Sequence, residues 1–196
     1  MQRVVRVDGT VEEGYRRALA EGEPVFVPTQ YYADDRGFSL MNQLQGVLSP
    51  KGQVNYSTQY PGVIKAWHRH KKQTDFWMCL RGHVKVGVWR ETDNEAWVQV
   101  IGEKQPGTVI IPPTLWHGAA TVGDEPAGLL YYVTETYNAA EPDEERAAHD
   151  ALEAFPWTVQ HGWAGCVGRC WGSVATACLF VRCARRCTGR VCRLRG

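Results

Sequence analysis

The 196-residue chain is expected to fold as an all-β protein, an antiparallel sandwich or barrel. Between Pro24 and Tyr137 it consists of short runs rich in Val, Ile, Tyr, Trp and Thr, separated by Gly, Pro, Asn and Asp. Hydrophobic residues make up 44% of the chain and charged residues 22%, which suits one sizeable core but not two full enzyme domains. The predicted strands are Val54–Gln59, Val63–His68, Phe76–Leu80, Val84–Trp89, Trp97–Ile101, Val109–Ile111 and Leu129–Thr134.

Short helices are expected on both sides of the β region. Thr10 is followed three residues later by Glu13, a capping-box pattern, and helix-forming residues then run to Ala20. The segment beginning at Pro142 has acidic residues in its first turn, where they suit a helix dipole. The sequence therefore predicts one helix over Val11–Ala20 and a second one ending near Leu152.

Composition changes abruptly near Gly162. Residues 163–196 hold six of the seven Cys and seven Arg, with no Asp or Glu. The Cys spacings lack the C-x2-C pairs that are usual in zinc sites, and no secretion signal supports a disulfide scaffold. These residues also include no Lys, Asn, Gln, Ile or Pro, the composition expected of a shifted reading frame in GC-rich DNA. An out-of-frame extension is therefore favoured over metal binding or a basic nucleic-acid arm. We expect residues 1–162 to be one domain and residues 163–196 to be a poorly ordered tail.

Charge and hydropathy indicate which partners to expect. The formal net charge is +1, and no apolar run approaches the roughly 20 residues that span a bilayer. The start of the chain lacks the apolar stretch of a secretory signal. We expect a cytoplasmic protein with a small-molecule partner, without nucleic acid, membrane or organic cofactor.

The chemically informative motif is Gly-x5-His-x-His-x4-Asp-x6-Gly, from Gly62 to Gly82. Two His one residue apart on a strand have side chains on the same face, so His68 and His70 are expected to point into the interior. Asp75 opens the next strand, and His117 follows the turn after Val109–Ile111. These four side chains are candidates for one pocket.

This motif resembles the first signature of the cupin family, with Asp75 where that signature carries Glu, and Gly107 to His117 resembles the second signature in shortened form. The resemblance implies a double-stranded β-helix, or jelly-roll, barrel. It also implies a divalent ion, Zn, Fe, Mn or Ni, held by His68, His70, Asp75 and His117. Hydrogen-bonded pocket histidines without metal are the alternative.

A second resemblance covers roughly Val25 to Trp157 and concerns the dTDP-4-dehydrorhamnose 3,5-epimerase group, itself a cupin-fold family. Five stretches of this chain resemble segments of that group. The stretch at Asp35 resembles D-x-R-G-x-F, that at Gln53 resembles Q-x-N-x-S, and that at Gly62 resembles G-V-V-R-G-L-H. The stretch at Ile111 resembles I-P-x-G-F-A-H-G, and that at Leu130 resembles L-Y-x-x-T-x-Y-Y.

The same resemblance implies roles for single residues. His68 lies where the group has its base and Tyr131 where it has its acid. The implied substrate contacts are Arg36, Gln53, Asn55, Lys65 and His117. Abstraction of a proton beside a ketone requires a base near neutral pKa and a proton source on the opposite face of the ring.

This chain also departs from the group's pattern. The group's active-site Arg becomes Lys65, its pocket Lys becomes Asp75, and the Gln two residues after the base becomes His70. Three functions are therefore considered: an isomerase acting on a nucleotide-linked 4-keto sugar, a metal-dependent oxygenase or isomerase of a small polar substrate, and a sugar-binding module without catalysis. Family members pair near the N-terminus, so the apolar strand expected at Pro24 to Tyr32 suggests a homodimer.

Overall fold

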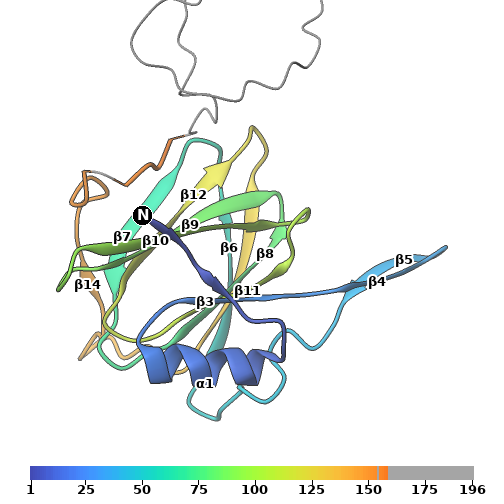
Figure 1. Ribbon diagram of the computed structural model, residues 1–196, viewed down its shortest axis with the longest axis horizontal. Helices are drawn as coiled ribbons and strands as arrows, with labels where there is room; N and C mark the ends of the chain where they lie inside the picture. Colours follow the sequence, from blue (N-terminus) through green and yellow to red (C-terminus); the bar gives the residue numbers. More distant parts are fainter. Residues whose placement is uncertain (154, 159–196) are drawn as a thin grey trace, which may run out of the picture. The chain divides into compact units, whose positions relative to one another are not determined.

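The computed structural model describes residues 1–153 and 155–158, and its main feature is two six-stranded β-sheets that face each other (Figure 1). The first sheet contains, in spatial order, β1 (Gln2–Arg3), β10 (Glu95–Gly102), β9 (His83–Arg90), β12 (Trp116–Val122), β7 (Ile64–Arg69) and β14 (Glu145–Arg146). The second contains β2 (Val5–Arg6), β3 (Val25–Pro28), β11 (Gly107–Ile111), β8 (Asp75–Arg81), β13 (Ala127–Val133) and β6 (Gln53–Gln59).

The predicted all-β jelly-roll fold is confirmed, in the form of a sandwich whose sheets do not close. All seven predicted strands are present, and their ends differ from the prediction by at most two residues. The strand β12, which carries His117, was not predicted as a strand. Its sequence is rich in Gly and Ala, which hides the usual enrichment in β-branched residues.

The core between the sheets follows from the two-residue period of a strand. Val84, Val86 and Val88 alternate along β9, and all three are fully buried. They pack in one cluster with side chains of the facing sheet, among them Trp77 on β8 and Leu129 on β13. Interior positions that carry polar side chains therefore stand out against an apolar background.

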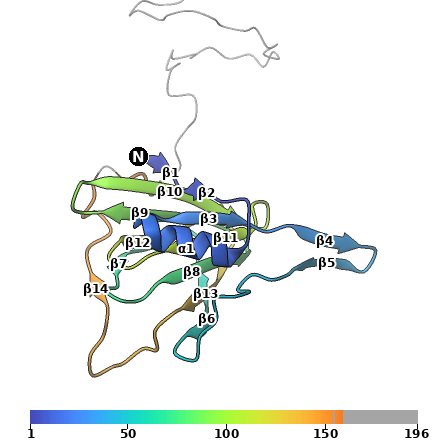
Figure 2. The same cartoon turned by 60° about the horizontal axis from the view of Figure 1, so that its bottom comes forward.

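A single α-helix occurs in the described residues, α1 (Val11–Glu21), and it matches the first predicted helix. The capping box is formed, because the Thr10 hydroxyl accepts from the Glu13 N–H and the Glu13 carboxylate accepts from the Thr10 N–H. The helix lies over β3 and β11 on the outer face of the second sheet (Figure 2). A Cβ at Gly14 would lie 2.4 Å from Val27 Cγ2, so glycine permits this close approach. No helix in the described part of the chain has the length and apolar character needed to cross a membrane.

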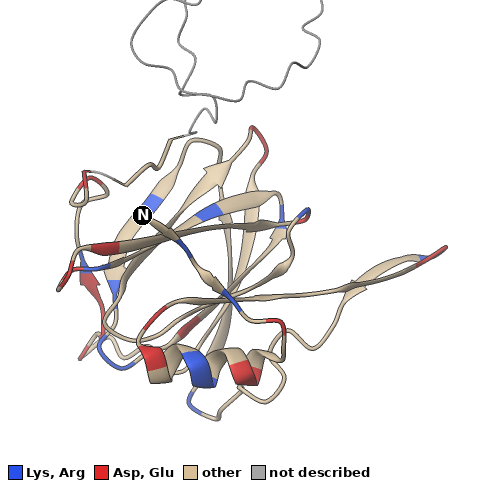
Figure 3. Ribbon diagram, viewed as in Figure 1, with Lys and Arg blue, Asp and Glu red and all other residues tan. Residues whose placement is uncertain are grey.

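The second predicted helix, from Pro142 to Leu152, is wrong. This segment contains β14, which pairs with the edge strand β7, followed by turns. Three of its acidic residues, which lie at and beside β14 (Figure 3), accept from backbone or side-chain donors instead of capping a helix. Asp143 accepts three backbone N–H groups, Glu144 pairs with Arg146, and Glu145 pairs with Arg69.

The strand expected over Pro24 to Tyr32 is divided. Its first part is β3, and its last residues begin β4 (Tyr31–Asp34), which forms a separate hairpin with β5 (Gly37–Leu40). This hairpin extends away from the two sheets in both views (Figures 1 and 2).

After β14 the chain packs against the outer face of the first sheet. Phe155 is buried against Trp67 and Trp116, so both of these Trp lie in an aromatic cluster outside the sandwich interior. Gly87 on β9 leaves space for this packing, because a Cβ there would lie 2.5 Å from Phe155 Cζ. The Lys85 ammonium donates to the carbonyls of Pro156, Trp157 and Thr158.

The expected domain boundary at Gly162 and the whole Cys- and Arg-rich tail, residues 163–196, lie outside the described residues. The domain prediction therefore stays a prediction.

Replacement of Phe155 by Ala is expected to lower the free energy of unfolding by about 3 kcal/mol, since it removes a buried aromatic ring from a packed cluster. Urea unfolding followed by tryptophan fluorescence measures this. Tyr60→Ala, which removes an exposed ring, is the control and should change stability by less than about 0.5 kcal/mol. Equal unfolding curves for wild type and Phe155→Ala would contradict the assignment of this segment to the folded unit.

Candidate functional site

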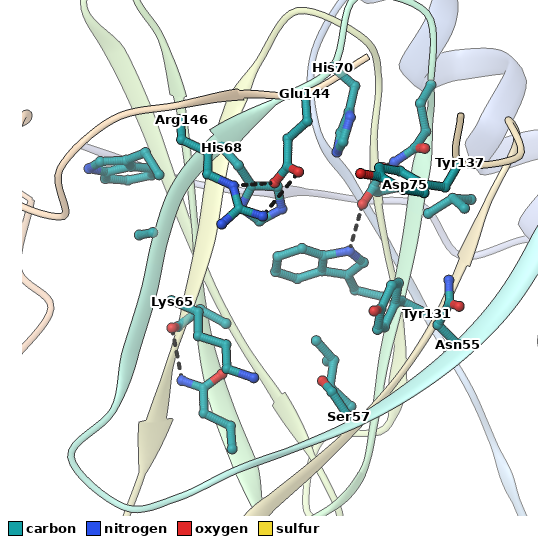
Figure 4. Close-up of a pocket in the computed structure, with 18 of the residues that line it drawn as sticks. Asn55, Ser57, Lys65, His68, His70, Asp75, Tyr131, Tyr137, Glu144 and Arg146 are labelled. Atoms are coloured by element: carbon teal, nitrogen blue, oxygen red, sulfur yellow. Dashed lines mark hydrogen bonds and ion pairs between the residues drawn. The ribbon is translucent and has the colours of Figure 1, made fainter. Parts of the chain in front are cut away.

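A cavity of about 580 Å³ opens between the two sheets. Figure 4 shows side chains entering it from β6 and β13 on one side and from β7 and the segment around β14 on the other. The polar and charged residues that line it are Gln53, Asn55, Ser57, Gln59, Lys65, His68, His70, Gln73, Asp75, Tyr131, Tyr137, Glu144 and Arg146. The volume suits a ligand of small-molecule size.

His68 and His117 are paired across neighbouring strands. They lie opposite each other in the β7–β12 register, and their ring centroids are 4.2 Å apart. Cross-strand partners share a face of the sheet, so both imidazoles point into the sandwich. His117 is almost fully buried beneath the pocket, whereas His68 lines the pocket itself.

An irregularity in the β7–β12 register brings Lys65 to the same face as His68. Lys65 pairs with Ala119 and His68 with His117, so three positions along β7 span two positions along β12. A bulge of this kind re-aims side chains. Strict two-residue alternation would place Lys65 on the face opposite to His68, and the bulge explains why Lys65 lines the pocket, as the family resemblance implied.

His70 comes directly after β7, and its ring lies 5.7 Å from those of His68 and His117 between centroids. Its Nδ1 is 2.6 Å from the backbone carbonyl oxygen of Asp143. An Nδ1–H that donates to this carbonyl leaves Nε2 with a free lone pair. Asp143 therefore orients His70 and not His68, the predicted base.

Asp75 opens β8, as the sequence predicted, and its carboxylate is buried. Oδ1 accepts from the Gln73 amide at 2.7 Å, and Oδ2 accepts from the Trp77 indole N–H at 3.0 Å. Burial by itself would raise the pKa of Asp75, but His117, His70 and the Gln73 hydrogen bond outweigh it and hold this pKa below its usual range. Asp75 is thus an anion in the interior.

The His117 ring lies between two acceptors. Its Nδ1 is 2.9 Å from the carbonyl oxygen of Leu115, and its Nε2 is 3.6 Å from Asp75 Oδ2. Among the described residues Nε2 is buried without a hydrogen-bond partner. A neutral imidazole has one N–H, so it satisfies only one of these acceptors. The arrangement suits a cation beside Nε2.

The four predicted metal ligands come together. His68, His70, Asp75 and His117 each offer one ligand atom, and these atoms lie within 4.8 Å of one another. Carbonyls that fix the Nδ1 side of His70 and His117 are the outer partners typical of metal-binding histidines. The residues present therefore fit a divalent ion of the kind bound by imidazole and carboxylate.

The predicted base and acid have opposite electrostatic environments. Burial, followed by the nearby His117, lowers the pKa of His68 well below its ordinary value, so the ring is neutral. Burial, followed by the charges of Asp75 and Glu144, raises the pKa of Tyr131, so the phenol keeps its proton. His68 belongs to the first sheet and Tyr131 to the second, on either side of the cavity.

The predicted substrate contacts are divided. Gln53 and Asn55, on β6, and Lys65 line the cavity, and His117 lies beneath it. Arg36 does not: it lies at the exposed tip of the β4–β5 hairpin and pairs with Asp34. Arg36 is therefore not among the described residues that line the cavity of the same chain.

Two charged lining residues were not predicted, Glu144 and Arg146. Both come from the segment that was interpreted as a helix, and they reach the cavity only because β14 adds to the edge of β7. The acidic run Asp143-Glu144-Glu145 was visible in the sequence, but its spacing alone did not indicate which edge it would join.

The fold and the site define a cupin-type β-sandwich with a polar, histidine-containing pocket. The chain belongs to the family described as "Polysaccharide biosynthesis C-terminal domain", which matches residues 32–145.

Two curated relatives are similar in sequence. The Bacillus subtilis (strain 168) protein named "Spore coat polysaccharide biosynthesis protein SpsL" is 36% identical over 137 residues, which are 66% of this chain and 91% of that protein. The Haloferax volcanii protein named "Probable low-salt glycan biosynthesis epimerase Agl13" is 42% identical over 101 residues, 48% of this chain and 65% of that protein.

A solved structure supports the fold. A dTDP sugar isomerase from Desulfovibrio desulfuricans G20 is 24% identical, with a TM-score of 0.58, and the match covers 73% of this chain and 92% of that chain.

Proposed function

We propose that this protein is an isomerase-class enzyme that epimerises or isomerises a nucleotide-linked 4-keto sugar by removing and returning a proton. Membership of a polysaccharide-biosynthesis family supports the substrate class, as do the names epimerase and dTDP sugar isomerase among its relatives and structural neighbours. The observation that carries the proposal is the placement of an imidazole, His68, and a phenol, Tyr131, on opposite sheets of one pocket.

The proposed reaction uses these two groups in sequence. His68 takes the proton from the carbon beside the ketone, and the C–H electron pair forms the enolate. Tyr131 then gives its hydroxyl proton to that carbon from the opposite face, and the ketone re-forms. The configuration at that carbon is inverted, and exchange with solvent restores both side chains.

Gln53 and Asn55 are proposed to bind the nucleotide, as the family resemblance implies. Both lie on β6, which pairs with the strand of Tyr131, and Figure 4 shows Asn55 on the same side of the cavity as Tyr131. Their amide groups offer donors and acceptors, which suits the edges of a base or a ribose.

Deuterium incorporation tests the acid–base pair. The protein is incubated in D2O with a dTDP-linked 4-keto-6-deoxy sugar, and exchange beside the ketone is followed by NMR. His68→Asn and Tyr131→Phe should each slow the overall conversion by at least about 100-fold, the usual contribution of a general acid or base. His149→Asn and Tyr60→Phe, matched changes outside the pocket lining, are the controls and should leave the rate unchanged.

The two variants should also differ from each other. Tyr131→Phe retains the base, so it should still exchange deuterium while inversion is lost. Wild-type protein that binds the sugar nucleotide but exchanges no deuterium would contradict the proposal and favour a sugar-binding module without catalysis.

A metal-dependent activity is the second candidate, and the unpartnered Nε2 of buried His117 favours it. His68, His70, Asp75 and His117 would hold the ion. A bound divalent ion would supply Lewis-acid stabilisation of a developing oxyanion. His68 serves either as the base or as a ligand, so the metal content decides between the two candidates.

Elemental analysis of protein purified without added metal measures this directly. The metal candidate predicts about one equivalent of Zn, Fe, Mn or Ni per chain, and His70→Ala should lose it because an imidazole ligand is removed. His83→Ala, on β9 and outside the cluster, is the control and should retain the ion. Metal-free wild-type protein with a normal melting curve would rule this candidate out.

A homodimer is proposed as the assembly. The β4–β5 hairpin exposes Tyr32 and Phe38, and the edge strand β6 exposes Val54 and Tyr56. Exposed apolar side chains on an unpaired edge are typical of an association surface. Since Arg36 lies on this hairpin, its implied contact with the nucleotide requires the pocket of a second copy.

Sedimentation at micromolar concentration should show a dimer. Replacement of both Tyr32 and Phe38 by Asp should shift the protein to monomer, because charges would then be buried at the interface. Leu19→Asp, an exposed apolar position on α1, is the control and should leave the dimer intact. A monomeric wild-type protein would contradict this proposal.

A further inference from the structure

The segment around β14 places a second cation at the pocket. Arg146 lies opposite His68 in the β14–β7 register, and cross-strand partners share a face. Because His68 faces the cavity, Arg146 does too, and Figure 4 shows its side chain beside that of His68. Its charge is near enough to contribute to the lowered pKa of His68.

The charged residues that line the pocket differ in whether other residues of the chain already satisfy them. Among the described lining residues the anions are Asp75 and Glu144, and the cations are Lys65 and Arg146. Asp75 is satisfied within the interior by the Gln73 amide and the Trp77 indole. A sugar nucleotide carries a diphosphate, so its anionic part must be met by Lys65 or Arg146 within this chain.

Arg146 has the geometry of a phosphate-binding group. Its Nε and Nη2 donate to the two carboxylate oxygens of Glu144 at 3.0 and 3.1 Å. A guanidinium has five N–H donors, so this fork leaves three for a ligand. The side chain of Glu144 is only 24% exposed and that of Arg146 is 79% exposed, so Glu144 holds the guanidinium toward the pocket mouth.

We propose that Arg146 binds the diphosphate of the sugar nucleotide, an inference that rests on the proposed function. An exposed guanidinium is well placed for a diphosphate, which stays near solvent. Stabilisation of an enolate instead requires a donor in a water-excluded site. Because the diphosphate is bound at the pocket mouth, the sugar points inward, toward His68 and Tyr131. Within one chain the guanidinium at the pocket is that of Arg146, because Arg36 lies outside this lining and reaches a nucleotide only in the pocket of a second copy.

Calorimetric titration with thymidine diphosphate, thymidine and inorganic pyrophosphate tests the assignment. Arg146→Gln should weaken thymidine diphosphate and pyrophosphate binding by about tenfold or more, the factor expected for loss of a charge-assisted contact, and should leave thymidine binding unchanged. Arg146→Lys keeps the charge, so its affinity for thymidine diphosphate should lie between those of the wild type and Arg146→Gln. Arg16→Gln, which removes the same charge on α1, should bind like the wild type.

The other outcomes are separable. Unchanged thymidine diphosphate binding by Arg146→Gln would overturn the inference while leaving the proposed function intact, most directly if Arg36→Gln lost the binding instead. A tenfold lower kcat of Arg146→Gln with unchanged diphosphate affinity would also overturn it, in favour of enolate stabilisation. Wild-type protein that binds no thymidine diphosphate at millimolar concentration would overturn both the inference and the proposed substrate class. Diphosphate binding that depends on Arg146 without deuterium exchange would overturn the proposed catalysis alone.

Discussion

A fully buried carboxylate, Asp75, is the constraint on which the pocket depends. A charge in the interior costs several kcal/mol unless donors and opposite charge surround it. Here an amide, an indole N–H and nearby imidazoles compensate it, and each comes from a position near β8 or from the facing sheet. The imidazoles that lower the cost of burying Asp75 are also the histidines of the candidate site. The interactions that stabilise the buried carboxylate therefore also position these histidines.

The sandwich explains why the candidate base and acid lie on opposite sides of the cavity. Packed sheets are about 10 Å apart, and large apolar side chains normally fill that space. Where β6, β7 and β13 carry polar residues instead, the sheets leave room for a ring between them. His68 and Tyr131 then approach from different sheets, which is the geometry that inversion at a carbon requires.

Local patterns in the sequence predicted much of this structure. The capping box at Thr10, the strand runs and the grouping of His68, His70, Asp75 and His117 were predicted because each depends on short spacings and strand alternation. The second helix was wrong because the acidic run that suggested it finds partners far away in sequence, such as the backbone after His70. The inward position of Lys65 depends on a bulge defined by a neighbouring strand, and that is not encoded in its own strand's alternation.

The segment from Asp143 to Trp157 links the pocket to the aromatic cluster on the outer face of the first sheet. At one end the Asp143 carboxylate accepts three backbone N–H groups from residues 71–73, and at the other Phe155 packs on the outer face of the first sheet. Between these anchors β14 adds an edge strand that presents Glu144 and Arg146 to the cavity. Because Arg146 is exposed and its contacts lie outside the apolar interior, its replacement changes stability little. Residues at the pocket mouth can therefore be replaced at little cost in stability while the buried Asp75 and its histidines stay the same.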